Sequence, residues 1–222
     1  MQAWLRAAET GVLGRPIDAP DRRAVFERND PTKKTYFLSG GAMEIFQRSA
    51  DGLSVVVKIL VAPTLFGQIE PLANMSAYLE SVRVAGGARF YAISPDAFKS
   101  LVRSDAALGF ECLVDMSSAF CVSARYEPSR MFDTEALLAN LVVSYARIFG
   151  ENVGDGTRIS LKRSQADLAE AIGAGERSVN RILAEWKNTN LIVKSRGCYV
   201  LKNTSALEKK AGDLLGSLIH AS

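Results

Sequence analysis

Short apolar runs separated by turn residues dominate the chain from Val25 to about Ser100. The stretch TYFLSGGAMEIFQRSADGLSVVVKILVAPTLFG predicts a strand, a turn at Gly40–Gly41, a second strand, an Ala-Asp-Gly hairpin and a third strand. The stretch YLESVRVAGGARFYAISPDAF has the same pattern of strands and turns, with a turn at Gly86–Gly87, and a helix then begins at Pro95. Strands at such short, even intervals predict an antiparallel barrel or roll.

The strand pattern ends at Asp105, and apolar residues then recur at helical spacing as far as Glu127. They form two stripes, one of Phe110, Leu113, Met116 and Phe120 and one of Leu108, Cys112, Ala119, Val122 and Tyr126. A helix that is apolar on two faces should be buried on two sides, so we expect one face on the roll and the other on a second copy of the chain. Pro128 predicts a kink or an end near Glu127, and a new helix capped by Asp133 then runs to Gly150.

The last third of the chain has the pattern of a winged helix-turn-helix. A short strand, RISL, precedes Ser164, which is a good helix N-cap and forms a capping-box-like pair with Asp167. The first helix ends at Gly173, and a Gly-Ala-Gly turn leads into a second helix, ERSVNRILAEWKNTN. The stretch LIVKSRGCYVLK predicts two strands around a basic tip, Ser195-Arg196-Gly197. The expected shared core of the two helices is Leu168, Ala169, Ile172, Val179, Ile182, Leu183 and Trp186.

The residues after this motif predict one more helix. Its apolar positions follow helical spacing, and we expect it to pack on the protein or on a dimer partner. These positions are Leu207, Ala211, Leu214, Leu215 and Leu218. His220, the single histidine of the chain, is interpreted as a solvated tail residue. With one histidine and no catalytic constellation, we expect neither an enzyme nor a metal site.

Charge is distributed unevenly along the 222 residues. The whole chain carries a formal net charge of +3, but the segment from Arg158 to Lys202 alone holds nine basic and four acidic residues. The remainder is therefore mildly acidic. A basic C-terminal third beside an acidic remainder suggests that the two parts have different partners, and a nucleic acid suits the basic part.

Cysteine usage and hydropathy exclude several classes of protein. Cys112, Cys121 and Cys198 are an odd number without metal-type spacing, which argues against a secreted disulfide framework. We interpret Cys112 and Cys121 as packing residues and Cys198, on the wing, as the candidate for an exposed redox-sensitive thiol. No segment has the pattern of a signal peptide or reaches the roughly 20 apolar residues of a membrane span, so we expect a cytoplasmic protein with no membrane partner.

From about Val25 to Lys202 the chain resembles the cyclic-AMP receptor protein and fumarate-nitrate regulator (CRP/FNR) family of bacterial transcription regulators. TYFLSGGAMEIF and SVRVAGGARFYAIS match strands of the family's sensory β-roll, and LFGQIEPL sits where the family has its phosphate-cradling loop. FDTEALLANLV matches the hinge, and DLAEAIGAGERSVNRILAEWKNTNLI matches the helix-turn-helix.

The resemblance implies an α+β fold in three parts. An N-terminal antiparallel β-roll, a cyclic-nucleotide-binding-like jelly roll, would occupy residues 1–104. A long dimerisation helix and hinge would occupy 105–132, and a C-terminal winged helix-turn-helix with the last helix would occupy 133–222. The implied partners are double-stranded DNA, a second copy of the chain in a homodimer, and RNA polymerase.

The resemblance also implies which residues contact DNA. The second helix of the motif would enter the major groove, where arginine pairs well with guanine and asparagine with adenine. The base-reading candidates are Arg177, Ser178, Asn180 and Arg181. The candidates for phosphate contact and positioning are Lys162, Arg163, Ser164, Gln165, Lys194 and Arg196.

The sequence departs from the family at the effector site. Cyclic-AMP receptors use a Gly-Glu pair and an Arg-Ser pair, where this chain has Gly67-Gln68 and, by alignment, Tyr78-Leu79. Loss of the arginine removes the bidentate contact to a phosphate, so we do not expect cyclic-AMP sensing of the usual type. A candidate effector pocket would be lined by Gly67, Gln68, Tyr78, Leu79, Val122 and Ser123.

No cofactor is expected either, since the β-roll has neither the N-terminal cysteine cluster of iron–sulfur relatives nor the histidine or cysteine of haem-sensing relatives. Two alternatives stay open. The chain is a DNA-binding regulator that needs no effector or binds an unidentified small molecule, or its DNA binding depends on a cyclic nucleotide or dinucleotide.

Overall fold

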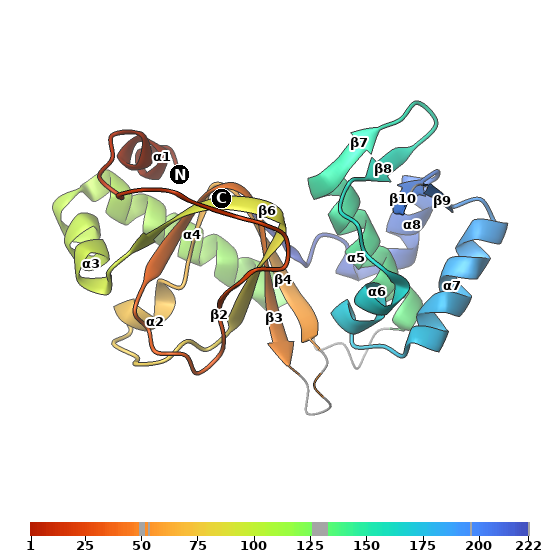
Figure 1. Ribbon diagram of the computed structural model, residues 1–222, viewed down its shortest axis with the longest axis horizontal. Helices are drawn as coiled ribbons and strands as arrows, with labels where there is room; N and C mark the ends of the chain where they lie inside the picture. The colour runs from red at the N-terminus through yellow and green to blue at the C-terminus, as the bar shows by residue number, and fades with distance from the viewer. Residues whose placement is uncertain (49–51, 53, 126–132, 196, 222) are drawn as a thin grey trace. The chain divides into compact units, whose positions relative to one another are not determined.

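The computed structural model describes residues 1–48, 52, 54–125, 133–195 and 197–221, and it describes the side chains of all of these except 122–125. The chain forms two compact units. The first, here called the sheet unit, consists of Met1–Phe46, Lys58–Val122 and His220–Ser222. The second, here called the helix-turn-helix unit, consists of Gln47–Val57 and Ser123–Ile219. Figure 1 shows the elements of both along the chain.

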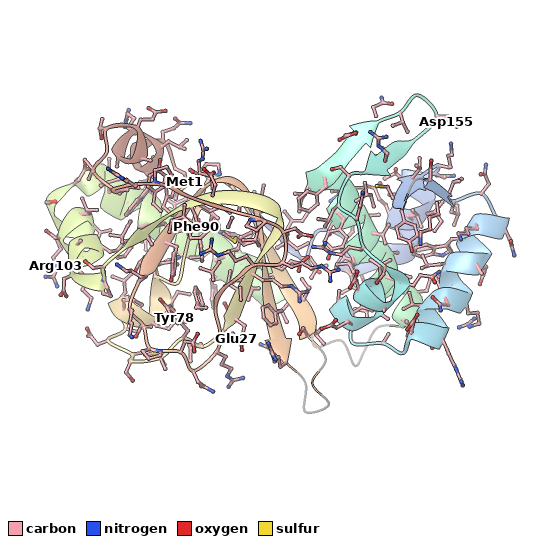
Figure 2. The ribbon with its side chains drawn as sticks, in the orientation of Figure 1. Met1, Glu27, Tyr78, Phe90, Arg103 and Asp155 are labelled. Atoms are coloured by element: carbon pink, nitrogen blue, oxygen red, sulfur yellow. The ribbon has the colours of Figure 1, made fainter. Side chains whose placement is uncertain are left out.

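An antiparallel roll forms the sheet unit, as the short apolar runs predict. Its strands are β1 Ile17–Ala19, β2 Ala24–Phe26, β3 Thr35–Arg48, β4 Ser54–Val61, β5 Thr64–Phe66, β6 Ser81–Ile93 and β11 Ile219–Ala221. The sheet runs in the order β1, β6, β3, β4, β11, with β2 paired to β6 and β5 paired to β3. Phe90 of β6 is buried in the sheet unit (Figure 2). Its ring meets the Tyr36 ring of β3 edge-on, with ring centroids 5.9 Å apart. The C-terminal strand β11 lies at the edge of the sheet, beside β4.

The two double glycines bend long strands instead of ending them. β3 and β6 continue through Gly40–Gly41 and Gly86–Gly87, so the turns predicted at these positions are wrong. The register between the two strands shifts around Gly41, which is the signature of a bulge. At Gly41 φ is +80°, and a Cβ atom would lie 2.1 Å from the Gly87 carbonyl oxygen. Glycine is therefore required here by the close approach of two backbones.

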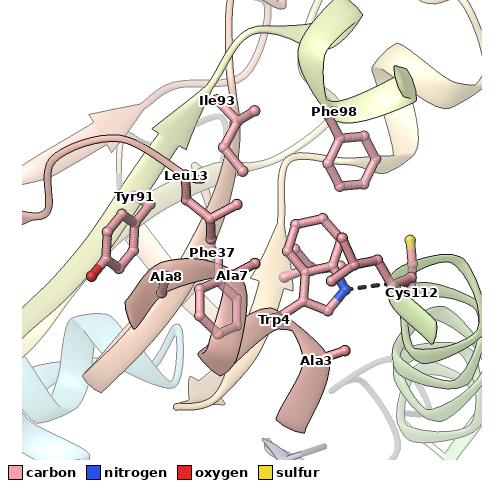
Figure 3. Packing of buried hydrophobic residues seen from close by; sticks show 12 residues of the cluster. Ala3, Trp4, Ala7, Ala8, Leu13, Phe37, Tyr91, Ile93, Phe98 and Cys112 are labelled. Atoms are coloured by element: carbon pink, nitrogen blue, oxygen red, sulfur yellow. Dashed lines mark hydrogen bonds between the residues drawn. The ribbon is translucent and has the colours of Figure 1, made fainter. Parts of the chain in front are cut away.

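Four helices of the described chain accompany this sheet: α1 Gln2–Glu9, α2 Ile69–Leu72, α3 Pro95–Ser104 and α4 Ala106–Arg125. Trp4 of α1 is fully buried and stacks on Phe98 of α3, with ring centroids 5.5 Å apart. Its Nε1 donates a hydrogen bond to the carbonyl oxygen of Leu108 in α4, at 3.1 Å (Figure 3). One side chain therefore joins three helices, of which the sequence predicts α3 and α4 but not α1.

α4 is buried on one face and exposed on another, in agreement with its two stripes. Leu108 and Cys112 are buried, whereas Phe110, Leu113 and Phe120 are exposed. Met116 is the exception in its stripe, because it packs partly buried against the core around Trp4. The predicted kink near Glu127 and Pro128 falls outside the described residues. Among the described helices, none combines the length and the apolar character that crossing a membrane requires.

The helix-turn-helix unit contains α5 Thr134–Phe149, β7 Gly150–Asn152, β8 Thr157–Ile159, α6 Gln165–Ala171, α7 Glu176–Asn188, β9 Ile192–Ser195, β10 Cys198–Leu201 and α8 Thr204–Ala211. Its sheet runs in the order β7, β8, β10, β9. Asp133 caps α5, and Ser164 and Asp167 form the capping box of α6, as predicted. All seven residues of the predicted shared core are buried. The β9–β10 wing is also confirmed, although Arg196 at its tip lies outside the described residues.

The C-terminal segment differs from its prediction. α8 ends at Ala211 instead of continuing to Leu218, because Gly212 and Gly216 have φ angles of +54° and +81° that no α-helix accommodates. A 3₁₀ turn, η2 Gly212–Leu214, follows, and the chain then forms β11. Leu207, Leu214 and Leu218 are nevertheless buried. The apolar spacing therefore predicted correctly that these leucines are buried, but the continuous helix it predicted is wrong.

Candidate nucleic-acid interface and ligand pocket

The predicted base-reading residues lie on the first turns of α7, away from its buried side. Arg177 and Arg181 are exposed one helical turn apart, and Ser178 and Asn180 beside them are half-buried. The opposite side of α7 is buried through the core residues Val179, Ile182, Leu183 and Trp186. The helix therefore presents two guanidinium groups, whose planar donors match the acceptor pattern of a guanine edge.

The residues predicted to contact phosphates divide into two groups. Lys162, Ser164 and Lys194 are exposed, and Gln165 is half-buried. Lys162 just before α6, Gln165 at its start and Lys194 on the wing are available to an anion, whereas Ser164 is engaged with Asp167 in the capping box of α6. Arg163 is different, and its prediction is corrected.

Arg163 packs inside the unit instead of facing solvent. It is 7% exposed, and its guanidinium carbon lies 6.0 Å from the centre of the Tyr145 ring. Its Nη1 also donates to the carbonyl oxygen of Lys162, at 3.1 Å. We therefore no longer count Arg163 among the phosphate contacts. A long cationic side chain can bury its stem and stack on a ring, which a charge pattern alone does not reveal.

Glu135 holds α7 in place through a contact that the sequence did not predict. Its Oε1 accepts a hydrogen bond from Trp186 Nε1 of α7 and pairs with Lys210 Nζ of α8, each at 2.7 Å. Burial by itself raises the pKa of the Glu135 carboxyl, but the bonds from Lys210 and Trp186 outweigh it and hold that pKa below its ordinary value. The sequence predicted Glu135 only as a favourable charge in the first turn of its helix. Its contact with α7 is long-range and carries no local signal.

A small cavity lies in the sheet unit, with a volume of about 50 Å³. Gly67 and Gln68 line it, as predicted, in the loop between β5 and α2. Four further polar residues that the sequence did not indicate also line it: Lys58, Glu70, Glu80 and His220. Lysine and carboxylates thus face one another in a partly buried space.

The charges of the cavity influence one another. Burial lowers the pKa of the Lys58 ammonium, and the nearby carboxylates of Glu80 and Asp115 oppose that shift. Burial likewise raises the pKa of the Glu80 carboxyl, with Lys58 opposing the shift and Glu70 adding to it. Carboxylates therefore outnumber ammonium groups around the cavity, which is unfavourable for a phosphate.

The other predicted pocket residues lie elsewhere. Tyr78 is buried against Phe26, with ring centroids 3.8 Å apart, and its hydroxyl donates to the carbonyl oxygen of Lys34. Leu79 is exposed, and its backbone N–H donates to Glu70 Oε1 at 2.9 Å. Neither lines the cavity. The side chains of Val122 and Ser123 fall outside the described part of the chain.

Asp115 of α4 organises the groups beside the cavity. It is 1% exposed, and its Oδ1 accepts a hydrogen bond from Thr64 Oγ1 at 2.7 Å. Its Oδ2 accepts from Gln68 Nε2 at 3.3 Å, and His220 Nε2 lies 3.2 Å from Oδ1. A detectable signal was present in the sequence, because Asp115 falls on the same helical face as Leu108, Cys112 and Ala119. A single acid on an apolar face needs buried partners.

His220 is the largest correction to the sequence-based picture. The sequence predicts a solvated tail residue, but His220 is 1% exposed and lies on β11 against Asp115. The partner is 105 positions away in the chain. Proximity to the end of a sequence predicts mobility only for residues that no other segment fixes in place.

The three cysteines are also arranged differently from their prediction. Cys112 is buried as expected, and burial raises the pKa of its thiol to about 11, with Asp115 adding to the shift. Cys121 is exposed and Cys198 is buried, the reverse of what was predicted for each. The prediction of an exposed, redox-sensitive thiol at Cys198 on the wing is therefore wrong. Within the described residues, no cluster of three or more metal-binding side chains occurs.

Comparison with known families gives two separate matches. Residues 17–105 match the cyclic nucleotide-binding domain, and residues 136–210 match the Crp-like helix-turn-helix domain. Curated relatives span most of the chain. A CRP-like cAMP-activated global transcriptional regulator of Mycobacterium tuberculosis is 20% identical over 197 residues and covers 88% of each chain. The global nitrogen regulator of Synechococcus elongatus is 25% identical over 220 residues, covering 92% of this chain and 94% of the relative.

Solved structures show the same fold. A transcriptional regulator of the CRP family from Thermus thermophilus matches with a TM-score of 0.75 at 18% identity, covering 88% of this chain and 96% of the other. The c-di-GMP responsive global regulator CLP of Xanthomonas campestris matches with a TM-score of 0.74 at 17% identity, covering 90% of this chain and all of the other. The relatives are named as transcription regulators, in agreement with the expectation that the chain is not an enzyme.

We predict that Glu135→Ala destabilises the helix-turn-helix unit by about 1–3 kcal/mol, because it removes a charged acceptor from a buried indole N–H and an ammonium group. Since the folded pKa of Glu135 is lowered, this contribution is present above its ordinary pKa and is lost as the pH falls through the folded value. Urea unfolding followed by tryptophan fluorescence measures the loss. Glu151→Ala, which removes an exposed partner of Arg158, is the matched control and should leave unfolding unchanged. Equal effects of the two variants would contradict the prediction.

Proposed function

Because this chain belongs to the CRP/FNR family of bacterial transcription regulators, we propose that it is a cytoplasmic homodimer that binds double-stranded DNA through α7 without requiring cyclic AMP. The observation that carries the proposal is the pair of exposed arginines, Arg177 and Arg181, on the second helix of a capped and winged helix-turn-helix. Family membership also supports RNA polymerase as a further partner.

The apolar face of α4 supports the dimer. Phe110, Leu113 and Phe120 are 67%, 60% and 74% exposed, and they lie at positions that repeat on one side of the helix. Large apolar side chains gathered on one exposed face are unfavourable in water and favour a partner surface. The same face of a second copy supplies a matching apolar stripe, as in a two-stranded coiled coil. We therefore assign α4 as the dimer contact.

The basic surface of the helix-turn-helix unit supports DNA as the partner. Lys162 and Lys194 carry positive charge at the start of the motif and on the wing, and both are exposed. Such bases position a protein on phosphates, whereas side chains on the second helix read base edges. A two-fold dimer presents two such helices, so the operator would be a pseudo-palindrome with half-sites about 34 Å apart.

The chemistry of the cavity supports independence from cyclic AMP. Its volume of about 50 Å³ leaves room for a few water molecules at roughly 10–15 Å³ each. Pockets for small ligands usually measure roughly 300–1,000 Å³. Glu70 and Glu80 repel an anion, and the nearby Arg83 is already engaged with Glu44 at 2.7 Å. No arginine lines the described cavity to bind a phosphate bidentately.

A cyclic nucleotide or dinucleotide effector is the second candidate function. Residues 17–105 match the cyclic nucleotide-binding domain, and one structural relative is named as responsive to c-di-GMP. In this alternative a ligand would have to be bound before the chain binds DNA. The two candidates share the fold and differ in whether ligand is obligatory.

A mobility-shift assay separates the two candidates. The full chain is mixed with DNA of its own promoter region, with and without cyclic AMP and c-di-GMP, at several salt concentrations. We expect specific, salt-sensitive binding without nucleotide. Binding that occurs only with a nucleotide would favour the second candidate. Absence of specific binding under every condition would reject both.

We predict that Arg181→Ala weakens specific DNA binding by about 1–3 kcal/mol and relaxes the preference at one base position, because it removes a guanidinium fork from a base edge. Binding to a library of operator variants measures both effects. Arg6→Ala, which removes an equal charge from the exposed surface of α1, is the control and should bind as the wild type does. A uniform loss on all sequences would show that Arg181 contacts phosphate only.

We predict that Leu113→Glu converts the dimer to a monomer, because two carboxylates would face each other across an apolar contact. Light scattering after size exclusion should give the chain mass of 24.0 kDa for this variant and twice that mass for the wild type. Val12→Glu places the same charge on an exposed apolar residue of the N-terminal region and should remain dimeric. A dimeric Leu113→Glu variant would show that α4 is not the contact.

A further inference from the structure

The cavity of the sheet unit is lined by a residue from the far end of the chain. His220 belongs to β11, the edge strand beside β4, and its imidazole borders the same space as Gln68, Lys58 and Glu80. It is 1% exposed, so the strand is inserted with this side chain inward. β11 is short, Ile219–Ala221, and a three-residue edge strand is held only weakly by its backbone bonds. The buried imidazole therefore supplies a large part of its attachment.

Asp115 explains why the imidazole is placed there. Its carboxylate accepts hydrogen bonds from Thr64 Oγ1 of β5 and from Gln68 Nε2 in the loop before α2. His220 Nε2 lies 3.2 Å from Oδ1 of the same carboxylate. Gln68 lies in the stretch LFGQIEPL, which corresponds to the family's ligand loop. The C-terminal strand thus shares one buried carboxylate with that loop. Movement of either changes the surroundings of the other.

The segment that leads into β11 is fixed to the helix-turn-helix unit. Ser217 Oγ accepts a hydrogen bond from Asn140 Nδ2 of α5 at 3.1 Å, and Asn140 Oδ1 accepts from the Gly216 N–H at 3.3 Å. Leu214 and Leu218 are buried in the same segment. Only Leu218 and Ile219 separate the Ser217 anchor from His220 in the chain. The imidazole therefore lies at the end of a short tether that is held by α5.

We propose that β11 is an intramolecular ligand of this cavity, with the His220 imidazole occupying the space that a small-molecule effector would need. A ligand of nucleotide size can then enter only after β11 has left β4. This inference deepens the proposed function, because a chain that supplies its own occupant does not need a diffusible one. The tether to α5 would make occupancy of the cavity and the state of the DNA-binding unit depend on one segment.

The single histidine of the sequence permits a direct test on the wild-type chain. Diethyl pyrocarbonate modifies accessible imidazole, and the product is followed by its ultraviolet absorbance. We expect His220 to react about tenfold or more slowly in the native protein than in urea, because opening of β11 limits access. The His220→Ala variant gives the background signal. Reaction at the same rate in native and unfolded protein would overturn the proposal, whether or not any variant folds.

Hydrogen exchange tests the attachment of the strand itself. In His220→Ala we expect the amides of β11 and of the facing part of β4 to exchange about tenfold or more faster than in the wild type. Ala221→Ser, which changes an exposed neighbour on the same strand, is the matched control and should exchange as the wild type does. Unchanged exchange in His220→Ala would show that the imidazole does not hold β11.

Competition tests the claim that the cavity has one occupant at a time. Cyclic AMP and c-di-GMP are added separately, and their binding is measured by calorimetry alongside the reactivity of His220. Either no binding, or binding that exposes His220 to the reagent, agrees with the proposal. A nucleotide that binds while His220 stays protected would overturn it. Protection of His220 does not depend on DNA, so a failure of DNA binding alone would reject the proposed function and leave this inference standing.

Discussion

A carboxylate that is almost completely buried must be compensated by hydrogen-bonding partners, and Asp115 imposes that constraint on the sheet unit. Its partners come from three stretches of chain, represented by Thr64, Gln68 and His220. The charge therefore determines where β5, the following loop and β11 meet α4. Removal of any partner leaves the others to solvate an ion in an apolar surrounding. The packing of α4 on the sheet and the position of the C-terminal strand have this common cause.

A second carboxylate has the same role in the helix-turn-helix unit. Glu135, at the start of α5, accepts from Trp186 of α7 and pairs with Lys210 of α8. The orientation of α7 is thus determined by this contact as well as by the turn at Gly173 and the apolar core. In the proposed function α7 must present Arg177 and Arg181 at a fixed angle, because bidentate recognition tolerates little misalignment. In the proposed function, Glu135 would therefore act on DNA binding by positioning α7.

Local rules predicted the helix-turn-helix motif itself and were less reliable for residues whose partners lie far away in the sequence. The capping box of Ser164 and Asp167 and the core around Trp186 follow from residues within a few turns of one another. At Gly41 the same residue type suits a turn and a bulge, and only pairing with a distant strand decides between them. His220 and Arg163 were misjudged for a related reason, because the partners that bury them are not visible in their local sequence. Gly212 did carry a local signal for the end of α8, and the apolar spacing obscured it.

The path of the backbone makes residues 123–219 of the helix-turn-helix unit an insertion. The chain leaves the sheet unit after Val122, in α4, and comes back to it at His220, in β11, so both ends of the inserted part lead into the sheet unit. Such attachment closes a long loop, as a disulfide does, and it lowers the conformational entropy of the inserted part before that part folds. β11, whose last two residues belong to the sheet unit, therefore contributes to the stability of the helix-turn-helix unit. If the chain were cut at residue 123, β11 would remain in the C-terminal fragment, whereas its partner strand β4 would remain in the N-terminal fragment.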